Sequence, residues 1–155
     1  MARKPRIEAV HEAIARLQRL TDLFQERREQ LASQVGLTEA QWSVLEEIST
    51  EHFMPSMFAR DQASSRASVS KVIRQLLDRR LVRVAISATD GRQRDYALTA
   101  DGKAKLARLR AERERAIETI WMRLDPEALT RFSELSVDLI GRIERHAAKT
   151  SSAKE

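Results

Sequence analysis

The residues best suited to chemistry in this chain are cations and short hydroxyl side chains in its middle third. Residues 56–94 contain nine Lys and Arg against three Asp and Glu, whereas the whole 155-residue chain has a net charge of +5. The excess positive charge therefore lies in one segment. A protein that binds the phosphate backbone of nucleic acid needs cations gathered in this way. Charge alone leaves open the alternative of a basic surface that only faces solvent.

Many of these cations fall on one predicted helix. Its apolar residues recur at the helical period: Val69, Val72, Ile73, Leu76 and Leu77. Small, hydroxyl and basic residues occupy the opposite face: Ala67, Ser68, Lys71, Arg74 and Gln75. Ser64 or Ser65 suits the N-cap. The sequence therefore predicts a helix with one buried face and one exposed basic face.

A β-hairpin is predicted directly after this helix. From Val82 onward apolar and polar residues alternate, which is typical of a half-buried strand. Asp90-Gly91 is a dipeptide that favours a hairpin turn, and Tyr96 and Leu98 fall on the return strand. Because the residues around the turn are basic, the hairpin has a positively charged tip.

Long helices are predicted on both sides of this basic module. Apolar spacings of three and four residues predict a first helix from about residue 7 to 33. Thr99 can cap a fifth helix that extends to about Leu124, and Asp125-Pro126 ends it and begins a sixth. The apolar stripes of these helices exceed what one small subunit can cover, so a second copy of the chain is the expected partner.

Two shorter helices are predicted between the first helix and the basic helix. Thr38 and Gln41 have the spacing of a capping box, and Leu37 and Trp42 stand at hydrophobic-staple positions, which predicts a second helix to about residue 49. Residues 50–56 are predicted to be a connection and residues 57–63 a short third helix.

The composition favours one mostly helical domain. The chain has only four glycines and three prolines, and it has no cysteine, which excludes disulfides and thiolate metal sites and suits the cytosol. Its basic start leads into no apolar segment, so neither a signal peptide nor a membrane span is expected. The sequence has no phosphate loop, nucleophile elbow or zinc-type histidine spacing. We therefore expect no metal, no cofactor and no catalytic activity.

Several of these segments together resemble a known family. The helix start Ser-Arg-Ala-Ser-Val-Ser-Lys is followed by Arg-Leu-Val-Arg-Val, Asp-Gly-Arg-Gln-Arg and Leu-Thr-Ala-Asp-Gly. This composite pattern, within residues 37–106, resembles the MarR (multiple antibiotic resistance regulator) family of winged helix-turn-helix regulators. The resemblance implies a mainly α fold with a small β-hairpin wing. Helices in residues 1–36 and 100–148 would dimerise around a DNA-binding lobe at 37–99, with a flexible tail at 149–155.

The resemblance also implies a function. Members of this family are homodimers that bind pseudo-palindromic double-stranded DNA, usually as repressors, and often release it when a small anionic or aromatic effector binds. We therefore expect a cytoplasmic, sequence-specific transcription regulator. An architectural protein that binds DNA without sequence preference is the alternative, because it would share the basic patch and the dimeric helices.

Residues that match the family pattern are the expected contacts with DNA. On the recognition helix, Arg66 and Arg74 are expected to read bases in the major groove while the other matched residues hold phosphates. On the wing, Arg92 is expected to enter the minor groove and Asp90 to steady the loop. The full expected set is Ser65, Arg66, Ser68, Ser70, Lys71, Arg74, Gln75, Asp90, Arg92 and Arg94.

The chain departs from the family pattern just before the recognition helix. Ala63 stands where a turn glycine is commoner, and Gln62 and Ser64 replace residues that are usually apolar. These departures bear on the packing and the bounds of the predicted third helix.

A cleft for an effector is expected near the first two helices. Its border would include His11, Trp42, Phe53 and Met54. Ordinary packing is the alternative for these residues, since a tryptophan at an apolar helical position, such as Trp42 or Trp121, is more often part of a core than of a ligand site.

Overall fold

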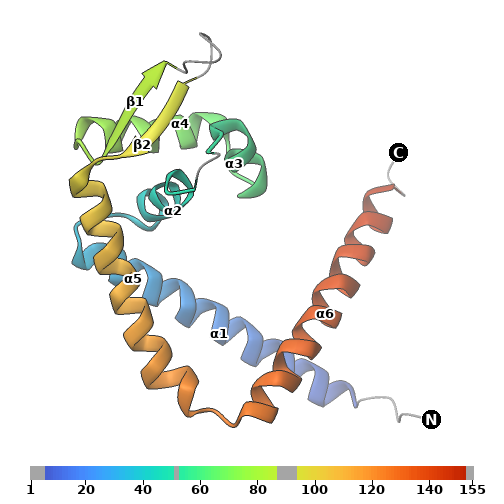
Figure 1. The fold of residues 1–155 in the computed structure, drawn as a ribbon. Helices are drawn as coiled ribbons and strands as arrows, with labels where there is room; N and C mark the ends of the chain where they lie inside the picture. Colours follow the sequence, from blue (N-terminus) through green and yellow to red (C-terminus); the bar gives the residue numbers. More distant parts are fainter. Residues whose placement is uncertain (1–5, 51–52, 87–93, 153–155) are drawn as a thin grey trace. The chain divides into compact units, whose positions relative to one another are not determined.

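The computed structural model describes residues 6–50, 53–86 and 94–152, which form helices and a two-stranded hairpin (Figure 1). The elements in chain order are α1 (Ile7–Gln34), α2 (Glu39–Ile48), α3 (Pro55–Asp61), α4 (Arg66–Asp78), β1 (Val82–Ile86), β2 (Arg94–Leu98), α5 (Ala100–Ile120), the 3-10 turn η1 (Trp121–Arg123) and α6 (Pro126–Ser152). The chain divides into two compact units within α5, between residues 112 and 113.

Side chains at the helix starts explain why several helices begin where the sequence predicted. The Thr38 hydroxyl accepts from the Gln41 backbone N–H at 3.1 Å, and the Gln41 side-chain oxygen accepts from the Thr38 N–H at 3.1 Å, so the predicted capping box of α2 is confirmed. The Ser65 hydroxyl accepts from the Ser68 N–H at 3.1 Å and caps α4. The Thr99 hydroxyl accepts in the same way at the start of α5.

The third helix begins and ends two residues earlier than predicted, so the predicted bounds of 57–63 were wrong. Pro55 occupies its first position, where the missing N–H of proline costs nothing. Ala63 lies beyond its end with φ +48, in the left-handed region that side chains disfavour. The chain therefore leaves the helix before Ala63 and turns sharply into α4.

The fifth helix is shorter than predicted. It ends at Ile120 and the chain continues as η1, so Trp121 and Leu124 lie outside it. A residue that precedes a proline avoids the helical conformation, and the chain must therefore leave the helix before Asp125. The Asp125 carboxylate accepts from the Ala128 N–H at 2.8 Å and caps α6 as expected. Helix α6 continues to Ser152, past the start of the predicted flexible tail.

The core of the first unit lies among the end of α1, α2, α4, the hairpin and the first half of α5. Its largest fully buried side chains are Trp42, Val44, Leu45, Leu76, Leu106 and Leu109. Burying each of these leucines stabilises the fold by about 1.5–3 kcal/mol. The hairpin pairs antiparallel, with Val82 opposite Leu98 and Ile86 opposite Arg94, which confirms the predicted hairpin. The half-buried face expected for its first strand was wrong beyond Val82, because Val84 and Ile86 are exposed.

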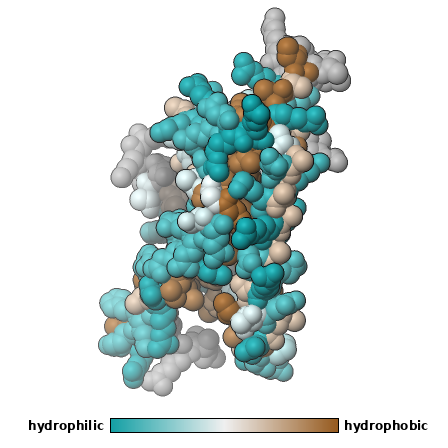
Figure 2. Space-filling view, turned by 90° about the vertical axis from the view of Figure 1, so that its left-hand side faces the viewer, coloured by the Kyte–Doolittle hydropathy of each residue, from teal (hydrophilic) through white to brown (hydrophobic). Residues whose placement is uncertain are grey.

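Apolar side chains remain exposed along the long helices. Helix α1 exposes Ile7, Ile14, Leu17, Leu20, Leu23 and Phe24, and α6 exposes Phe132, Leu135, Val137, Ile140 and Ile143. Figure 2 shows apolar side chains lying among polar ones on the face that it draws. Such uncovered apolar surface is typical of helices that associate with a partner. No helix in the described ranges is long and apolar enough to cross a membrane.

Candidate nucleic-acid interface

Helix α4 buries one face and exposes the other, as the sequence predicted. Val69 and Ile73 are buried against the core, while α3 and β1 pack beside the helix. Arg66, Lys71 and Arg74 are exposed, and none of the three has an ion-pair partner in the described part of the chain. Their charges are therefore available to a negatively charged partner.

The serines of the expected site are all exposed near the start of α4. The Ser65 and Ser68 hydroxyls lie 2.8 Å apart and are hydrogen-bonded to each other, besides the capping bond already described. Ser70 lies two residues beyond Ser68 and is also exposed. Short hydroxyl side chains leave room for a close approach to DNA.

Gln75 differs from the other expected DNA contacts on α4 because it is half-buried. Its side-chain oxygen accepts a hydrogen bond from Gln41 Nε2 at 3.1 Å. The Gln75 amide is therefore bonded to α2 through its oxygen, so the whole amide is not available at the exposed basic face of α4.

The hairpin carries further exposed cations. Arg83 on β1 and Arg94 at the start of β2 are both exposed, and β1 packs against α4. Asp90 and Arg92, which the sequence analysis expected at the tip, lie outside the described residues.

Arg60 is a candidate contact that the sequence analysis missed. With Arg66 it borders a hollow of about 310 Å³ whose other lining residues are Ser56, Met57, Ala59 and Ser64. Arg60 also lies 3.7 Å from Asp61, but both side chains are mostly exposed, so this ion pair is weak. The first helix of a helix-turn-helix crosses the DNA backbone, and the single cation of the short third helix was a usable signal.

Solved structures with the same arrangement of elements include MarR-family regulators. A crystal structure of a MarR family transcription regulator matches with a TM-score of 0.82 over 91% of this chain and 94% of that one, at 18% identity. The YusO protein of Bacillus subtilis matches with a TM-score of 0.67 over 89% of this chain and 99% of that one, at 21% identity. The chain has the MarR winged-helix fold.

A DNA complex also occurs among the solved structures with this MarR fold. The S. aureus MepR–DNA complex matches with a TM-score of 0.68 over 82% of this chain and 93% of that one, at 15% identity. No protein-family model and no curated protein sequence matches the chain. The likeness is therefore one of fold, and it confirms the predicted fold class.

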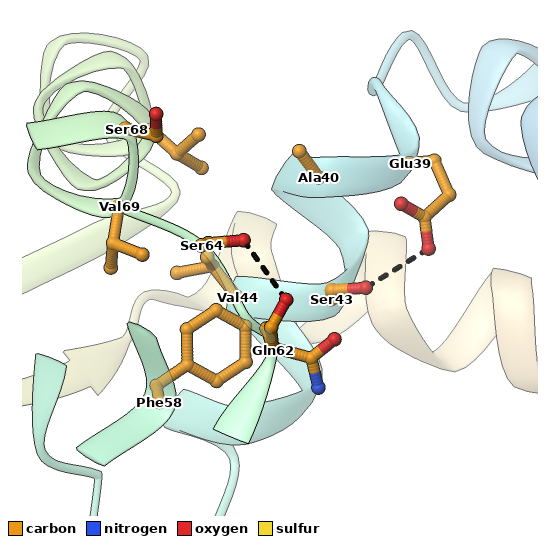
Figure 3. A pocket seen from close by; sticks show the side chains of 10 residues that line it. Glu39, Ala40, Ser43, Val44, Phe58, Gln62, Ser64, Ser68 and Val69 are labelled. Carbon is orange, nitrogen blue, oxygen red and sulfur yellow. Dashed lines mark hydrogen bonds between the residues drawn. The ribbon is translucent and has the colours of Figure 1, made fainter. Parts of the chain in front are cut away.

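A smaller hollow of about 120 Å³ lies between α2 and α4 of this MarR fold (Figure 3). Figure 3 shows the Ser43 hydroxyl bonded to Glu39, at 3.0 Å, and the Ser64 hydroxyl bonded to the Gln62 carbonyl, at 3.3 Å. Because these polar groups already have partners and Glu39 is acidic, this hollow is poorly suited to hold a DNA phosphate.

The four residues expected around an effector cleft have different surroundings. Trp42 is 1% exposed, with the Arg28 guanidinium 4.2 Å from its ring centre, and Phe53 packs edge-on against neighbouring aromatic rings. Both therefore belong to the core, while His11 and Met54 are exposed. Packing, the alternative given for Trp42, is confirmed.

A hollow of about 480 Å³ lies against α2, β2 and the start of α5. Three cations and three hydroxyls line it above an apolar floor: Ile48, Ser49, Thr50, Arg83, Tyr96, Ala97, Leu98, Lys103, Leu106 and Arg110. Arg110 Nη2 donates to the Ser49 hydroxyl at 3.0 Å, which holds this cation at the rim. The surroundings suit a small anion with an apolar body.

Metal ligation finds no support in the described ranges. No group of three or more His, Asp or Glu side chains there is placed to hold a metal ion.

Proposed function

We propose that this chain is a sequence-specific DNA-binding transcription regulator of the cytoplasm that represses by occupying a pseudo-palindromic operator as a homodimer. The observation that carries the proposal is the exposed basic face of α4 with Arg66, Lys71 and Arg74, beside the basic hairpin. The solved MepR–DNA complex, which has the same fold, supports this reading.

In the proposed complex α4 lies in the major groove. Arg66 and Arg74 have the planar fork that binds guanine O6 and N7 together, and each such contact is worth about 1–3 kcal/mol of discrimination. Lys71 and the serines of α4 hold phosphates, as does Arg60 of α3, because the first helix of the motif crosses the backbone. Arg92 and Arg94 of the wing reach the flanking minor groove, where A·T-rich DNA concentrates negative potential.

The exposed apolar residues of α1 and α6 support the proposed dimer. A second copy would cover them and would place two recognition helices about 34 Å apart, one turn of DNA. A non-specific architectural protein would also be a dimer, but its binding would not depend on the spacing of two half-sites in the DNA.

Relief by a small effector is also part of this proposal. The hollow bordered by Arg83, Lys103 and Arg110 is the favoured place, because Trp42 and Phe53 of the earlier candidate cleft are buried in the core. A ligand held there would contact β2 and α5 at once. Such a ligand causes the protein to release DNA only if it binds more tightly to a conformation whose wing or recognition helix is misplaced than to the DNA-binding conformation.

Fluorescence anisotropy tests the DNA-binding proposal. The protein is titrated against a duplex enriched by the protein itself from random sequence and against a scrambled duplex, at two salt concentrations. A regulator prefers the enriched duplex by about 10³-fold or more, whereas an architectural protein shows little preference and only a steep salt dependence. Absence of binding at low salt would refute both.

A further inference from the structure

Gln41 is the one polar side chain that is buried among the described residues, with 6% of its surface exposed. Its Oε1 atom accepts from the Thr38 backbone N–H at 3.1 Å and from Arg79 Nη1 at 2.9 Å. Its Nε2 atom donates to Gln75 Oε1 at 3.1 Å. Gln75 and Arg79 lie 34 and 38 positions later in the sequence, in the last turn and at the C-cap of α4. A single buried amide therefore joins the start of α2 to the end of α4.

The Arg79 guanidinium extends this link to a third segment. Its Nη2 atom donates to the Gly36 carbonyl oxygen at 2.7 Å. Gly36 has φ +70 and forms the turn between α1 and α2. Within the first unit, α4 is thus held at its C-terminal end by hydrogen bonds to two fixed points of the chain.

These bonds differ in kind from the apolar contacts between α2 and α4. Apolar burial is non-directional and tolerates a helix that rolls about its own axis, whereas hydrogen bonds require defined distances and angles. A roll of about 20° moves the surface of a helix, about 5–6 Å from its axis, by about 2 Å. Functional side chains must be held within about 0.5 Å of a productive geometry, so such a roll would lose a bidentate contact with a base.

We propose that Gln41 is a positioning residue that fixes the rotation of α4 and so determines which bases Arg66 and Arg74 reach. This inference rests on the proposed function as a DNA-binding regulator. Gln41 is buried and cannot touch DNA, so any effect of its substitution on base preference must pass through α4. The same hydrogen bonds give Gln75 a structural role in the recognition helix. Its Oε1 atom accepts from Gln41, whichever group its Nε2 atom contacts.

Three variants separate positioning from simple loss of stability. Gln41→Leu preserves the size of the side chain but removes all of its hydrogen bonds. Thr38→Ala is the matched control, because it weakens the same capping box without touching α4. Gln41→Glu is the conservative rescue: its oxygens still accept from Thr38 and Arg79, and the Gln75 amide can turn to donate to it. If Gln41→Leu fails to fold by circular dichroism, Arg79→Leu breaks the same link from the exposed end of α4.

The readout is the ratio of the dissociation constants for scrambled and enriched duplexes, measured by anisotropy at one salt concentration. We expect Gln41→Leu to lower this ratio by about tenfold, the effect of one lost base contact, while non-specific affinity changes less than about twofold. Arg79→Leu lowers the ratio in the same direction, and Thr38→Ala and Gln41→Glu leave it unchanged. An unchanged ratio in Gln41→Leu, or an equal fall in Thr38→Ala, would overturn the positioning role alone. Wild-type protein without any preference would instead refute the proposed function, and this inference with it.

Discussion

Gly102→Ala adds a single methyl group, and we expect it to destabilise the fold more than any other substitution of that size. Gly102 is buried in the first turn of α5, and a Cβ atom there would lie 2.1 Å from the backbone oxygen of Leu81. That oxygen cannot retreat freely, because it accepts from the Thr99 N–H at 3.1 Å, and the Thr99 hydroxyl donates to the neighbouring Arg80 carbonyl at 2.7 Å. Relief of the clash must therefore displace the junction of α4, β1 and α5.

The size of this effect follows from three contributions. Overpacking of a close-packed site costs about 1–3 kcal/mol. A weakened hydrogen bond at the junction lowers the stability by about 1 kcal/mol more. The better helix propensity of alanine offsets about 1 kcal/mol of this loss. We expect a net loss of about 2 kcal/mol in the free energy of unfolding, which lowers Tm by about 4–8 °C for a chain of this length.

Thermal and urea unfolding followed by circular dichroism at one protein concentration measures this loss. The control is Gly141→Ala in α6, where the nearest neighbour is the Arg145 Nη1 atom at 3.1 Å, the far end of a flexible side chain. This substitution at a half-buried position is expected to stabilise by about 0.5–1 kcal/mol, the usual gain for alanine in a helix. If Gly102→Ala proved as stable as wild type, the close packing of α5 on Leu81 would be refuted.

Four further outcomes follow from the same structure. Ala63→Gly is expected to stabilise by about 0.5 kcal/mol in urea unfolding, because glycine relieves the left-handed φ of +48 at a smaller cost in unfolded-chain entropy; a loss of stability would contradict this reading of the turn. Arg74→Ala should relax base preference by about tenfold in anisotropy, and Arg92→Ala should weaken binding to all duplexes, so unchanged affinity in both variants would remove α4 and the wing from the interface. Ile140→Glu places a charge on the exposed apolar face of α6 and should shift sedimentation toward the monomer, whereas an unchanged dimer would place the interface elsewhere. Arg110→Ala should weaken the binding of 1-naphthoate by about tenfold in calorimetry, as loss of a charge-assisted contact predicts, and equal binding would move the ligand out of the hollow.

Features fixed by neighbouring residues could be predicted from the sequence. The capping box of Thr38 and Gln41, the Ser65 cap of α4 and the hairpin itself each depend on residues within a few positions, and all three were confirmed. The buried face of α4 followed from its period alone. The bounds of α3 and the end of α5 were missed because competing local signals decide them, Pro55 in one case and the bend before Asp125 in the other.

Features made by distant residues could not be predicted. The link from Gln41 to Gln75 and Arg79 joins positions 34 and 38 apart, and nothing in the local pattern of Gln41 beyond its cap indicates it. The hollow beside Arg110 likewise collects residues from α2, the hairpin and α5. Trp42 and Phe53 were placed near a cleft because aromatic residues fit both a core and a ligand site, and only packing distinguishes the two.

Selection from a random-sequence duplex library, followed by sequencing of the bound DNA, is the most direct test of sequence-specific binding by a dimer. We expect enrichment of an inverted repeat whose half-sites are centred about 10 base pairs apart, the spacing of two recognition helices in one dimer. We also expect Arg74→Ala to enrich a sequence relaxed at one position of each half-site. Binding without enrichment of any sequence, or enrichment without a repeat, would contradict a dimer that reads DNA through α4.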